Sequence, residues 1–159
     1  MLKMADGRRG AQSLLVRKTI ERIVRDVEPR DYLSQLASIY NWIIARWQYL
    51  KDPVPAEMVT DPLAIVENIQ NTGRFLGDCD DVATFLVGAA RAIGIRAVPM
   101  RVGFQKGKVI VLRGKRRRIP GPYTHVLAVA RDQYGRTVAL DPVAGERTWS
   151  MLRRTKRYG

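Results

Sequence analysis

The stretch from Gly77 to Gly94 constrains the fold of this chain more than any other. Its apolar positions recur every three or four residues, which is the period of one helix face. These positions are Cys79, Val82, Ala83, Leu86, Ala89, Ala90 and Ile93. Val87 and Ala92 are apolar as well but lie off that face, so we expect a helix that is buried on most sides. Asp78 is placed to cap the N-terminus of this helix and Gly94 to end it.

Composition indicates an ordinary globular protein around this helix. The 159 residues are 46% hydrophobic and 27% charged, which predicts a single domain over residues 1–159. No apolar run approaches the roughly 20 residues that cross a bilayer, and the N-terminal residues lack the apolar core of a signal peptide. One cysteine excludes an internal disulfide and fits a reducing compartment, so we expect a cytoplasmic protein with no membrane partner.

The order of the remaining elements predicts an α+β fold. Amphipathic helices are expected over residues 13–27 and 33–50, with a short helical segment over 61–69. Strands are expected after Gly94, over residues 96–104, 109–112, 123–130 and 137–142. Residues 113–118 are interpreted as a basic loop, residues 1–10 as a basic N-terminal arm and residues 150–159 as a basic C-terminal tail. Helices followed by antiparallel strands are typical of α+β domains.

The cysteine and the histidine are candidates for nucleophilic catalysis. A cysteine nucleophile needs an imidazole that carries protons and a third group that holds the imidazole. Because the chain has one cysteine and one histidine, the pair is Cys79 and His125. Asp141 is the natural third member, since a hairpin turn near residues 132–135 joins the strands that carry the histidine and the aspartate. In an antiparallel hairpin the numbers of two paired residues have a constant sum. An even sum (an even register) places Asp141 on the same face as His125, directly opposite or one diagonal step away. An odd sum (an odd register) places the two residues on opposite faces.

Each of these residues also has a purely structural interpretation. A cysteine on a helix face is often a small buried hydrophobe, a histidine beside a strand is often a satisfied polar residue, and Asp141 before Pro142 can simply end a strand. Other chemistries fit less well. A calcium loop that began at Asp78 would have Ala83 where glycine is needed and Ala89 where glutamate is needed. One cysteine and one histidine cannot build a structural zinc site without unusual carboxylate ligands. We therefore predict no metal and no cofactor.

Several of these motifs together resemble the transglutaminase-like superfamily, whose fold is papain-like. The segments concerned are Gly77-Asp78-Cys79-Asp80-Asp81, Tyr123-Thr124-His125-Val126 and Leu140-Asp141-Pro142, with Ile39–Ile43 and Trp47–Pro53 upstream. The resemblance runs over about residues 33–143 and implies a helix packed on an antiparallel sheet. It implies that Cys79 is the nucleophile, His125 the general base and acid, and Asp141 the carboxylate that orients the imidazole.

The resemblance also implies a reaction, namely amide hydrolysis or acyl transfer through a thioester on a protein or peptide substrate. Hydrolysis by a protease or amidase is favoured over protein crosslinking. The oxyanion would be stabilised by the backbone N–H of Cys79 at the helix start. Tyr49 or Trp47 is a further donor candidate from the resemblance.

The net charge of +13 exceeds what catalysis requires and indicates an acidic partner, either nucleic acid or an acidic protein. Basic residues gather at Arg8-Arg9, between residues 113 and 118, and between residues 153 and 157. The residues predicted to contact this partner are Arg113, Lys115, Arg116, Arg117 and Arg118. Small proteins that resemble this family also occur among tailed-phage structural genes. The alternative to an enzyme is therefore a non-catalytic structural or binding protein, such as a phage virion component that contacts DNA or an acidic protein.

Overall fold

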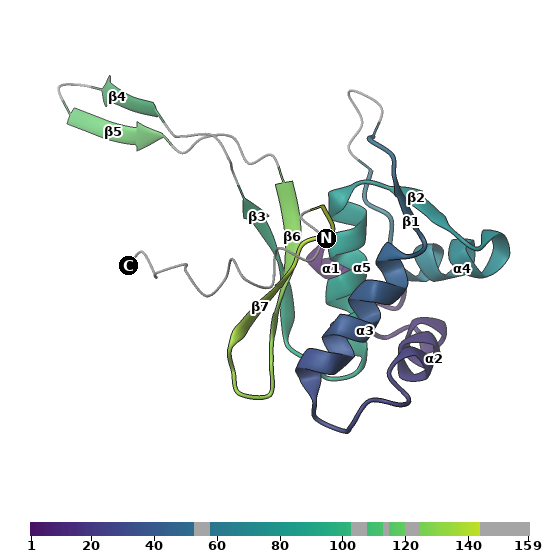
Figure 1. Cartoon of the computed structure of the whole chain (residues 1–159). Coiled ribbons are helices and arrows are strands. Elements are labelled where there is room, and N and C mark those ends of the chain that lie inside the picture. Colours follow the sequence, from purple (N-terminus) through teal and green to yellow (C-terminus); the bar gives the residue numbers. More distant parts are fainter. Residues whose placement is uncertain (53–57, 103–107, 113–114, 120–124, 144–159) are drawn as a thin grey trace.

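The first half of the chain is mostly helical (Figure 1). A computed structural model describes residues 1–52, 58–102, 108–112, 115–119 and 125–143, and for 108–112 and 115–119 it describes the backbone only. The helices are α1 (Leu2–Asp6), α2 (Leu14–Ile23), α3 (Tyr32–Ile44), α4 (Pro62–Thr72) and α5 (Cys79–Ala92).

Short polar side chains fix where the main helices begin. Ser13, Asp31 and Asp61 accept hydrogen bonds from the first-turn backbone N–H groups of α2, α3 and α4, respectively. α4 ends at Gly73, whose φ of 78° is a left-handed conformation that glycine adopts without strain. Two helices end earlier than the apolar periodicity predicts. α2 stops at Ile23 instead of residue 27, and α3 stops at Ile44 instead of residue 50.

The strands form separate groups in the described part of the chain. β1 (Trp47–Tyr49) pairs in parallel with β2 (Phe75–Gly77). The main sheet has the order β3-β6-β7, and its strands β3 (Ala97–Val102), β6 (His125–Arg131) and β7 (Thr137–Leu140) are antiparallel. β4 (Lys108–Leu112) and β5 (Lys115–Ile119) form a hairpin that extends away from the helices (Figure 1).

The structure corrects several strand and loop predictions. Residues 47–49 form a strand where a helix was expected. Residues 115–118, expected in a loop, lie in β5, because each pairs with a residue of β4. Residues 1–10 contain α1, in which Ala5 is fully buried and Asp6 forms an ion pair with Arg91 of α5. Arg113 and the predicted tail at 150–159 lie outside the described residues.

Helix α5 lies between the main sheet and the other helices (Figure 1). Every residue from Asp81 to Ala90 is buried, as the apolar pattern predicts, and α5 contacts β3, β6 and each of the other helices. The largest side chains that α5 contributes to the core are Phe85, Leu86 and Val82. Gly88 allows close packing here, because a Cβ at this position would lie 2.9 Å from Pro62. The arrangement confirms an α+β fold. No helix in the described ranges has both the length and the apolar character of a membrane span.

Candidate active site

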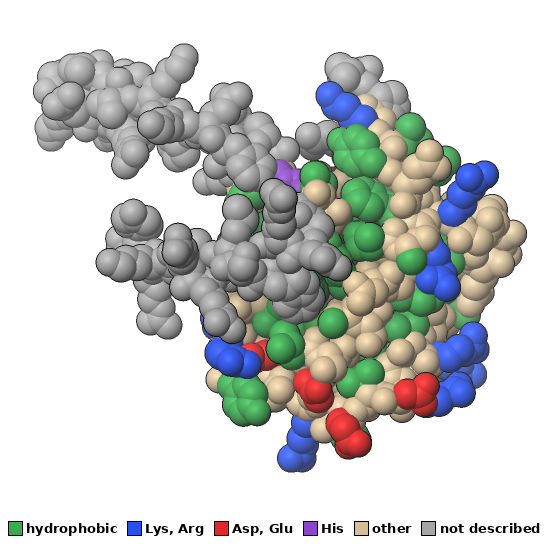
Figure 2. All heavy atoms as spheres, in the orientation of Figure 1, with side chains coloured by type: hydrophobic (Ala, Val, Ile, Leu, Met, Phe, Trp, Pro, Cys, Tyr) green, Lys and Arg blue, Asp and Glu red, His purple; other side chains and the backbone are tan. Residues whose placement is uncertain are grey.

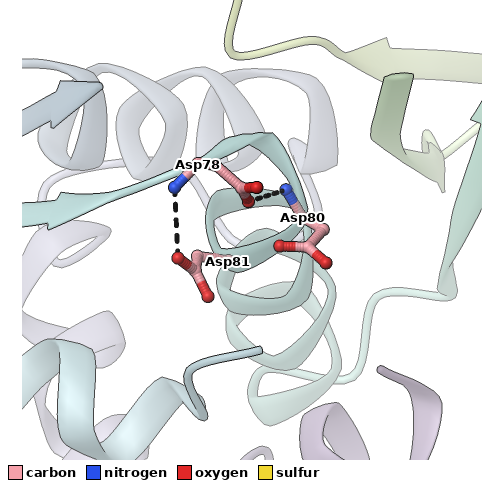
Figure 3. Close-up of side chains that lie close together, drawn as sticks. All are labelled: Asp78, Asp80 and Asp81. Carbon is pink, nitrogen blue, oxygen red and sulfur yellow. Dashed lines mark hydrogen bonds between the residues drawn. The ribbon is translucent and has the colours of Figure 1, made fainter. Parts of the chain in front are cut away.

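Cys79 is the first residue of α5, directly after the cap Asp78. The Asp78 carboxylate accepts the backbone N–H of Asp80 at 3.0 Å, and the Asp81 carboxylate accepts the backbone N–H of Asp78 at 3.1 Å (Figure 3). These contacts belong to a reciprocal capping box, which satisfies otherwise unpaired donors of the first turn. The box fixes the backbone on both sides of Cys79, which orients its side chain.

The strand before Cys79 is held by β1. The Gly77 carbonyl accepts the indole N–H of Trp47 and the backbone N–H of Leu50, each at 2.9 Å. Gly77 has no room for a side chain, because a Cβ there would meet the Asp81 carboxylate and lie 2.6 Å from the ring of Phe75. Asp81 also accepts the backbone N–H of Thr60 at 2.6 Å, and its side chain is almost fully buried. The backbone segment that leads into Cys79 is therefore closely packed against β1, Phe75 and Asp81.

His125 and Asp141 meet at the end of the main sheet. β6 and β7 pair Ala128 with Leu140, an even register that places Asp141 one diagonal step from His125 on the same face. His125 Nε2 lies 2.7 Å from Asp141 Oδ1, and both side chains are 8% exposed. Asp141 Oδ1 also accepts the backbone N–H of Val143 at 2.9 Å. The contact is the one that the hairpin geometry allows for an even register.

Tyr40 of α3 adds a contact that sequence reasoning missed. Its hydroxyl donates to the backbone carbonyl of Asp141 at 2.7 Å, in a buried position. Burial, with the nearby charge of Asp141, raises the pKa of Tyr40, so the hydroxyl remains a donor near neutral pH. The two residues are far apart in the chain, and no local pattern connects them. This bond ties the strand end that carries Asp141 to the helical half.

Cys79 begins α5, which packs against β6, the strand that starts at His125. The backbone N–H groups of Val126, the residue after His125, and of Cys79 itself lower the pKa of the thiol. Burial has the larger effect and raises the pKa of Cys79, and the charges of Asp78 and Asp80 raise it further. The net pKa shift is upward, so the neutral thiol is favoured over the thiolate before any contribution from a protonated imidazole.

The aromatic oxyanion candidates differ in what they contact. Trp47 donates its single indole N–H to Gly77, and this bond would have to break before Trp47 could donate to a substrate. Tyr49 is 55% exposed and pairs with Gly77 in the β1–β2 register. Burial raises the pKa of Tyr49, and the charges of Cys79 and Asp78 add to this effect, which places its hydroxyl in the electrostatic range of the thiol. Tyr49 is therefore the better-placed donor.

The carboxylates of Asp78, Asp80 and Asp81 each have an oxygen within 4.8 Å of the others (Figure 3). Burial, the hydrogen bond with Asp78 and the charges of neighbouring aspartates raise the pKa of Asp80 to about 8. Its Oδ1 is buried without a hydrogen-bond partner among the described residues. Burial also raises the pKa of Asp81, against the hydrogen bonds that it accepts. The raised pKa of Asp80 means that this carboxyl group binds a proton near neutral pH, which reduces the negative charge of the cluster.

The basic residues predicted to bind a partner lie apart from these side chains. Lys115, Arg116, Arg117 and Arg118 are on β5 of the projecting hairpin (Figure 1), and Arg113 lies outside the described residues. The structure therefore brings His125 and Asp141 together at one end of the main sheet, and Val126, the next residue of β6, is close enough to Cys79 to affect the pKa of its thiol. It keeps the predicted partner-binding residues on a separate element.

Comparison with known proteins agrees with the fold described above. The model of the transglutaminase-like superfamily matches residues 17–142. Among solved structures, the chain is similar to "a Putative Cysteine Protease from Cytophaga hutchinsonii", with a TM-score of 0.55 and 18% identity. The similarity covers 90% of this chain and 42% of the Cytophaga chain, so the present chain corresponds to less than half of that protein. A search of the curated proteins gives no significant match.

Proposed function

Because the chain belongs to the transglutaminase-like superfamily, we propose that it is a cysteine-dependent amide hydrolase or acyl transferase, with hydrolysis favoured over protein crosslinking. One observation carries this proposal. His125 Nε2 lies 2.7 Å from Asp141 Oδ1 in a buried contact, and the backbone N–H of Val126, the residue after His125, lowers the pKa of the Cys79 thiol. This contact supports a triad in which Cys79 is the nucleophile, His125 the imidazole base and Asp141 the orienting carboxylate, the set that acyl transfer requires.

In the first proposed step Cys79 forms a thioester with the substrate. Because Nε2 of His125 faces Asp141, Nδ1 is the nitrogen that takes the thiol proton. The thiolate attacks the amide carbonyl carbon, and a C–S bond forms while the carbonyl oxygen becomes an oxyanion. When this intermediate collapses, the C–N bond breaks, and the imidazolium returns its proton to the leaving amine.

In the second step the acyl group leaves Cys79. His125 takes a proton from a water molecule, which attacks the thioester carbonyl. The C–S bond then breaks, and the thiolate recovers the proton from His125. An amine that replaced the water would give acyl transfer by the same route. The Asp141 carboxylate holds the tautomer of His125 with a proton on Nε2 and stabilises the imidazolium in both steps.

The proposed oxyanion donors are the backbone N–H of Cys79 and the hydroxyl of Tyr49. The N–H of Cys79 belongs to the first turn of α5, where backbone donors have no partner within the helix. A Tyr49 hydroxyl that remains protonated, because its pKa is raised, can donate to the developing charge. The indole of Trp47 has a structural role in this account, as the donor to Gly77.

The raised pKa of Cys79 favours a second candidate function, a non-catalytic binding protein that keeps the family fold. A thiol surrounded by aspartates is a poor nucleophile unless His125 stabilises the thiolate as an ion pair. The two candidates therefore differ in whether Cys79 forms a covalent acyl intermediate.

Trapping the thioester tests the proposed enzyme. The full-length protein is incubated with a pool of unfolded-protein peptides and hydroxylamine, and peptide hydroxamates are measured by mass spectrometry. We expect hydroxamates with the unaltered protein and none with Cys79→Ser, which keeps nearly the same shape. Peptide hydroxamates that form equally with Cys79→Ser, or that never form, would contradict the proposal. Comparison of hydroxamates with free peptide acids measures transfer against hydrolysis.

A further inference from the structure

The positive charge of the chain is concentrated in one part of the sequence. No Asp or Glu occurs between Asp81 and Asp132, a stretch that includes most of α5, all of β3 to β6 and many Lys and Arg residues. The helical part differs. On the face drawn in Figure 2, its Lys and Arg side chains lie singly or in small groups among neutral residues, with Asp and Glu at the lower edge. The sheet side therefore carries the larger uncompensated charge.

A pocket of about 580 Å³ lies where α5 ends and β3 begins, and it is lined by Arg91, Arg96 and Arg131 above an apolar floor. Arg131 is held by the Gly135 carbonyl and the Thr137 hydroxyl at 3.0 and 2.8 Å, both neutral acceptors. Arg91 donates to the Ala97 carbonyl at 2.7 Å and pairs with Asp6, the one carboxylate that any of these arginines contacts among the described residues. The pocket thus retains a positive charge that suits an anionic ligand.

The adjacent edge of β3 is not suited to bind another strand. The Arg96 carbonyl accepts the backbone N–H of Arg131. In an antiparallel pair only every second residue bonds to the partner strand, so the backbone N–H and C=O groups of residues 97, 99 and 101 point away from β6. Pro99 has no N–H to offer, and the Ala97 carbonyl is already occupied by Arg91. A ligand on this surface is therefore held by side-chain charge and not by extension of the sheet.

The chain continues from β3 towards the β4–β5 hairpin, whose second strand has basic residues at four successive positions, 115–118. The hairpin register places an apolar residue of β4 opposite each basic residue of β5. The pairs are Leu112 with Lys115, Val111 with Arg116, Ile110 with Arg117 and Val109 with Arg118. Successive residues of a strand alternate between its two faces, so both faces of the hairpin carry a basic position. Arg101, which is exposed near the end of β3, lies in the chain between the pocket and this hairpin.

We propose that β3, the arginine pocket and the β4–β5 hairpin form a binding surface for duplex DNA that does not depend on base sequence. A strand of six residues such as β3 spans about 20 Å at roughly 3.3 Å per residue. Arg96, directly before β3, and Arg101, near its end, therefore place positive charge near both ends of the strand instead of at one point. A two-stranded ribbon also fits the major groove of B-DNA, which is about 12 Å wide. Arginine suits phosphate because its planar guanidinium binds two oxygens at once.

The salt dependence of DNA binding tests this surface. The anisotropy of a labelled 20-base-pair duplex of mixed sequence is measured with the full chain over a range of NaCl concentrations. Each phosphate contact contributes about 0.9 to the slope of log affinity against log salt concentration. We expect Arg116→Gln/Arg117→Gln/Arg118→Gln to reduce the magnitude of the slope by up to about 3. Arg96→Gln/Arg101→Gln, at two exposed positions that form no ion pair among the described residues, should reduce it by up to about 2.

Lys18→Gln/Arg22→Gln on α2 is the matched control, because it removes the same charge as the Arg96 and Arg101 pair from a different, exposed surface. It should leave the slope unchanged. An equal loss in the control and the β3 variant would overturn the proposal, as would negligible DNA binding at low salt. Val98 and Met100 are exposed on β3, so an acidic protein is the competing partner. Binding of poly-glutamate is measured in the same way. If poly-glutamate binds as tightly as DNA of equal charge, and the same variants weaken this binding, the ligand is an acidic protein and not DNA.

The outcome is independent of the proposed catalysis. Cys79→Ser should leave DNA affinity and its salt slope unchanged, because the thiol makes no phosphate contact. A protein that binds DNA but forms no hydroxamates would retain this surface and lose the proposed enzyme activity.

Discussion

Asp141 combines two roles at the scale of a single residue. Its side chain contacts His125 Nε2 at 2.7 Å, and its backbone carbonyl accepts the Tyr40 hydroxyl at 2.7 Å. Only the first contact depends on the carboxylate. A substitution that changes the carboxylate alone can therefore separate catalysis from folding.

We predict that Asp141→Asn lowers kcat by about 10²–10⁴-fold, because an amide no longer favours the required tautomer or stabilises the imidazolium. The amide oxygen can still accept the N–H of Val143, and the Tyr40 bond is untouched, so the fold should persist. Peptide release and circular dichroism measure the two effects. Asp132→Asn is the control, since this buried aspartate at the other end of the hairpin binds Arg136 and not His125. It should lower stability and leave kcat unchanged. Full activity of Asp141→Asn would mean that another group orients His125.

The residues of the site differ in how far the sequence alone could find them. Asp141 could be placed beside His125 because a short hairpin limits the pairing register to a few choices. Tyr40 and Val126 could not be found in this way. Tyr40 reaches Asp141 across the boundary between helices and sheet, and Val126 contributes a backbone N–H, which no residue type reveals. The indole of Trp47 donates to the Gly77 carbonyl, a contact between residues 30 positions apart that the resemblance to a family did not indicate.

At the scale of elements, the junction of β2 and α5 determines how the cysteine is presented. Gly77 lies between the Phe75 ring and the Asp81 carboxylate, and its φ is not in the left-handed region. Glycine is therefore needed at position 77 because there is no space for a side chain, and not because of the backbone conformation. Gly73, at the end of α4, has the opposite character, since its φ is +78° and a Cβ there would meet nothing within 4 Å.

We predict that Gly77→Ala destabilises the protein by roughly 2 kcal/mol or more, because a Cβ would displace Asp81 and open the capping box. Gly73→Ala should cost about 1–2 kcal/mol from backbone strain alone. Urea unfolding gives both free energies, and the alkylation rate of Cys79 reports on the junction. Only Gly77→Ala should change that rate. A Gly77→Ala protein with unaltered stability and alkylation would show that the junction tolerates a side chain.

Elements with strong local signals could be predicted, and those without could not. The start of α5 follows from Asp78, and the start of α4 from Asp61-Pro62, because caps are local features of the sequence. β1 and β2 are three residues each and too short to show a period. β5 has four consecutive basic residues, a pattern that favours a loop, and only its pairing with β4 makes it a strand.

At the scale of the whole molecule, the aspartates at the start of α5 make stability depend on pH. The pKa of Asp80 is about 8 in the folded protein and about 3.9 in an unfolded chain. Between these values the folded state binds more protons than the unfolded state, so this group lowers the free energy of unfolding as pH rises from about 4 to about 8. The raised pKa of Asp81 acts in the same direction.

We predict that Asp80→Asn is more stable than the unaltered protein above pH 8, with a Tm increase on the order of 2–4 °C, the change that about 1 kcal/mol makes in a domain of this size. The amide removes the buried charge and can donate to Asp78. At pH 5 the difference should be small, because Asp80 is already protonated. Thermal unfolding at pH 5 and pH 8.5 checks this. A Tm difference that is the same at both pH values would contradict the raised pKa of Asp80.

The central claim, that His125 activates Cys79, is tested most directly by the alkylation rate of Cys79 with iodoacetamide from pH 5 to pH 10. An ion pair with His125 predicts a plateau of reactivity at neutral pH, below the ordinary thiol pKa of about 8.5. In His125→Ala that plateau should vanish, and the rate should follow a single titration above 8.5, because burial and the charges of Asp78 and Asp80 raise the pKa of Cys79. The same single titration in both proteins, without a neutral plateau, would contradict the account.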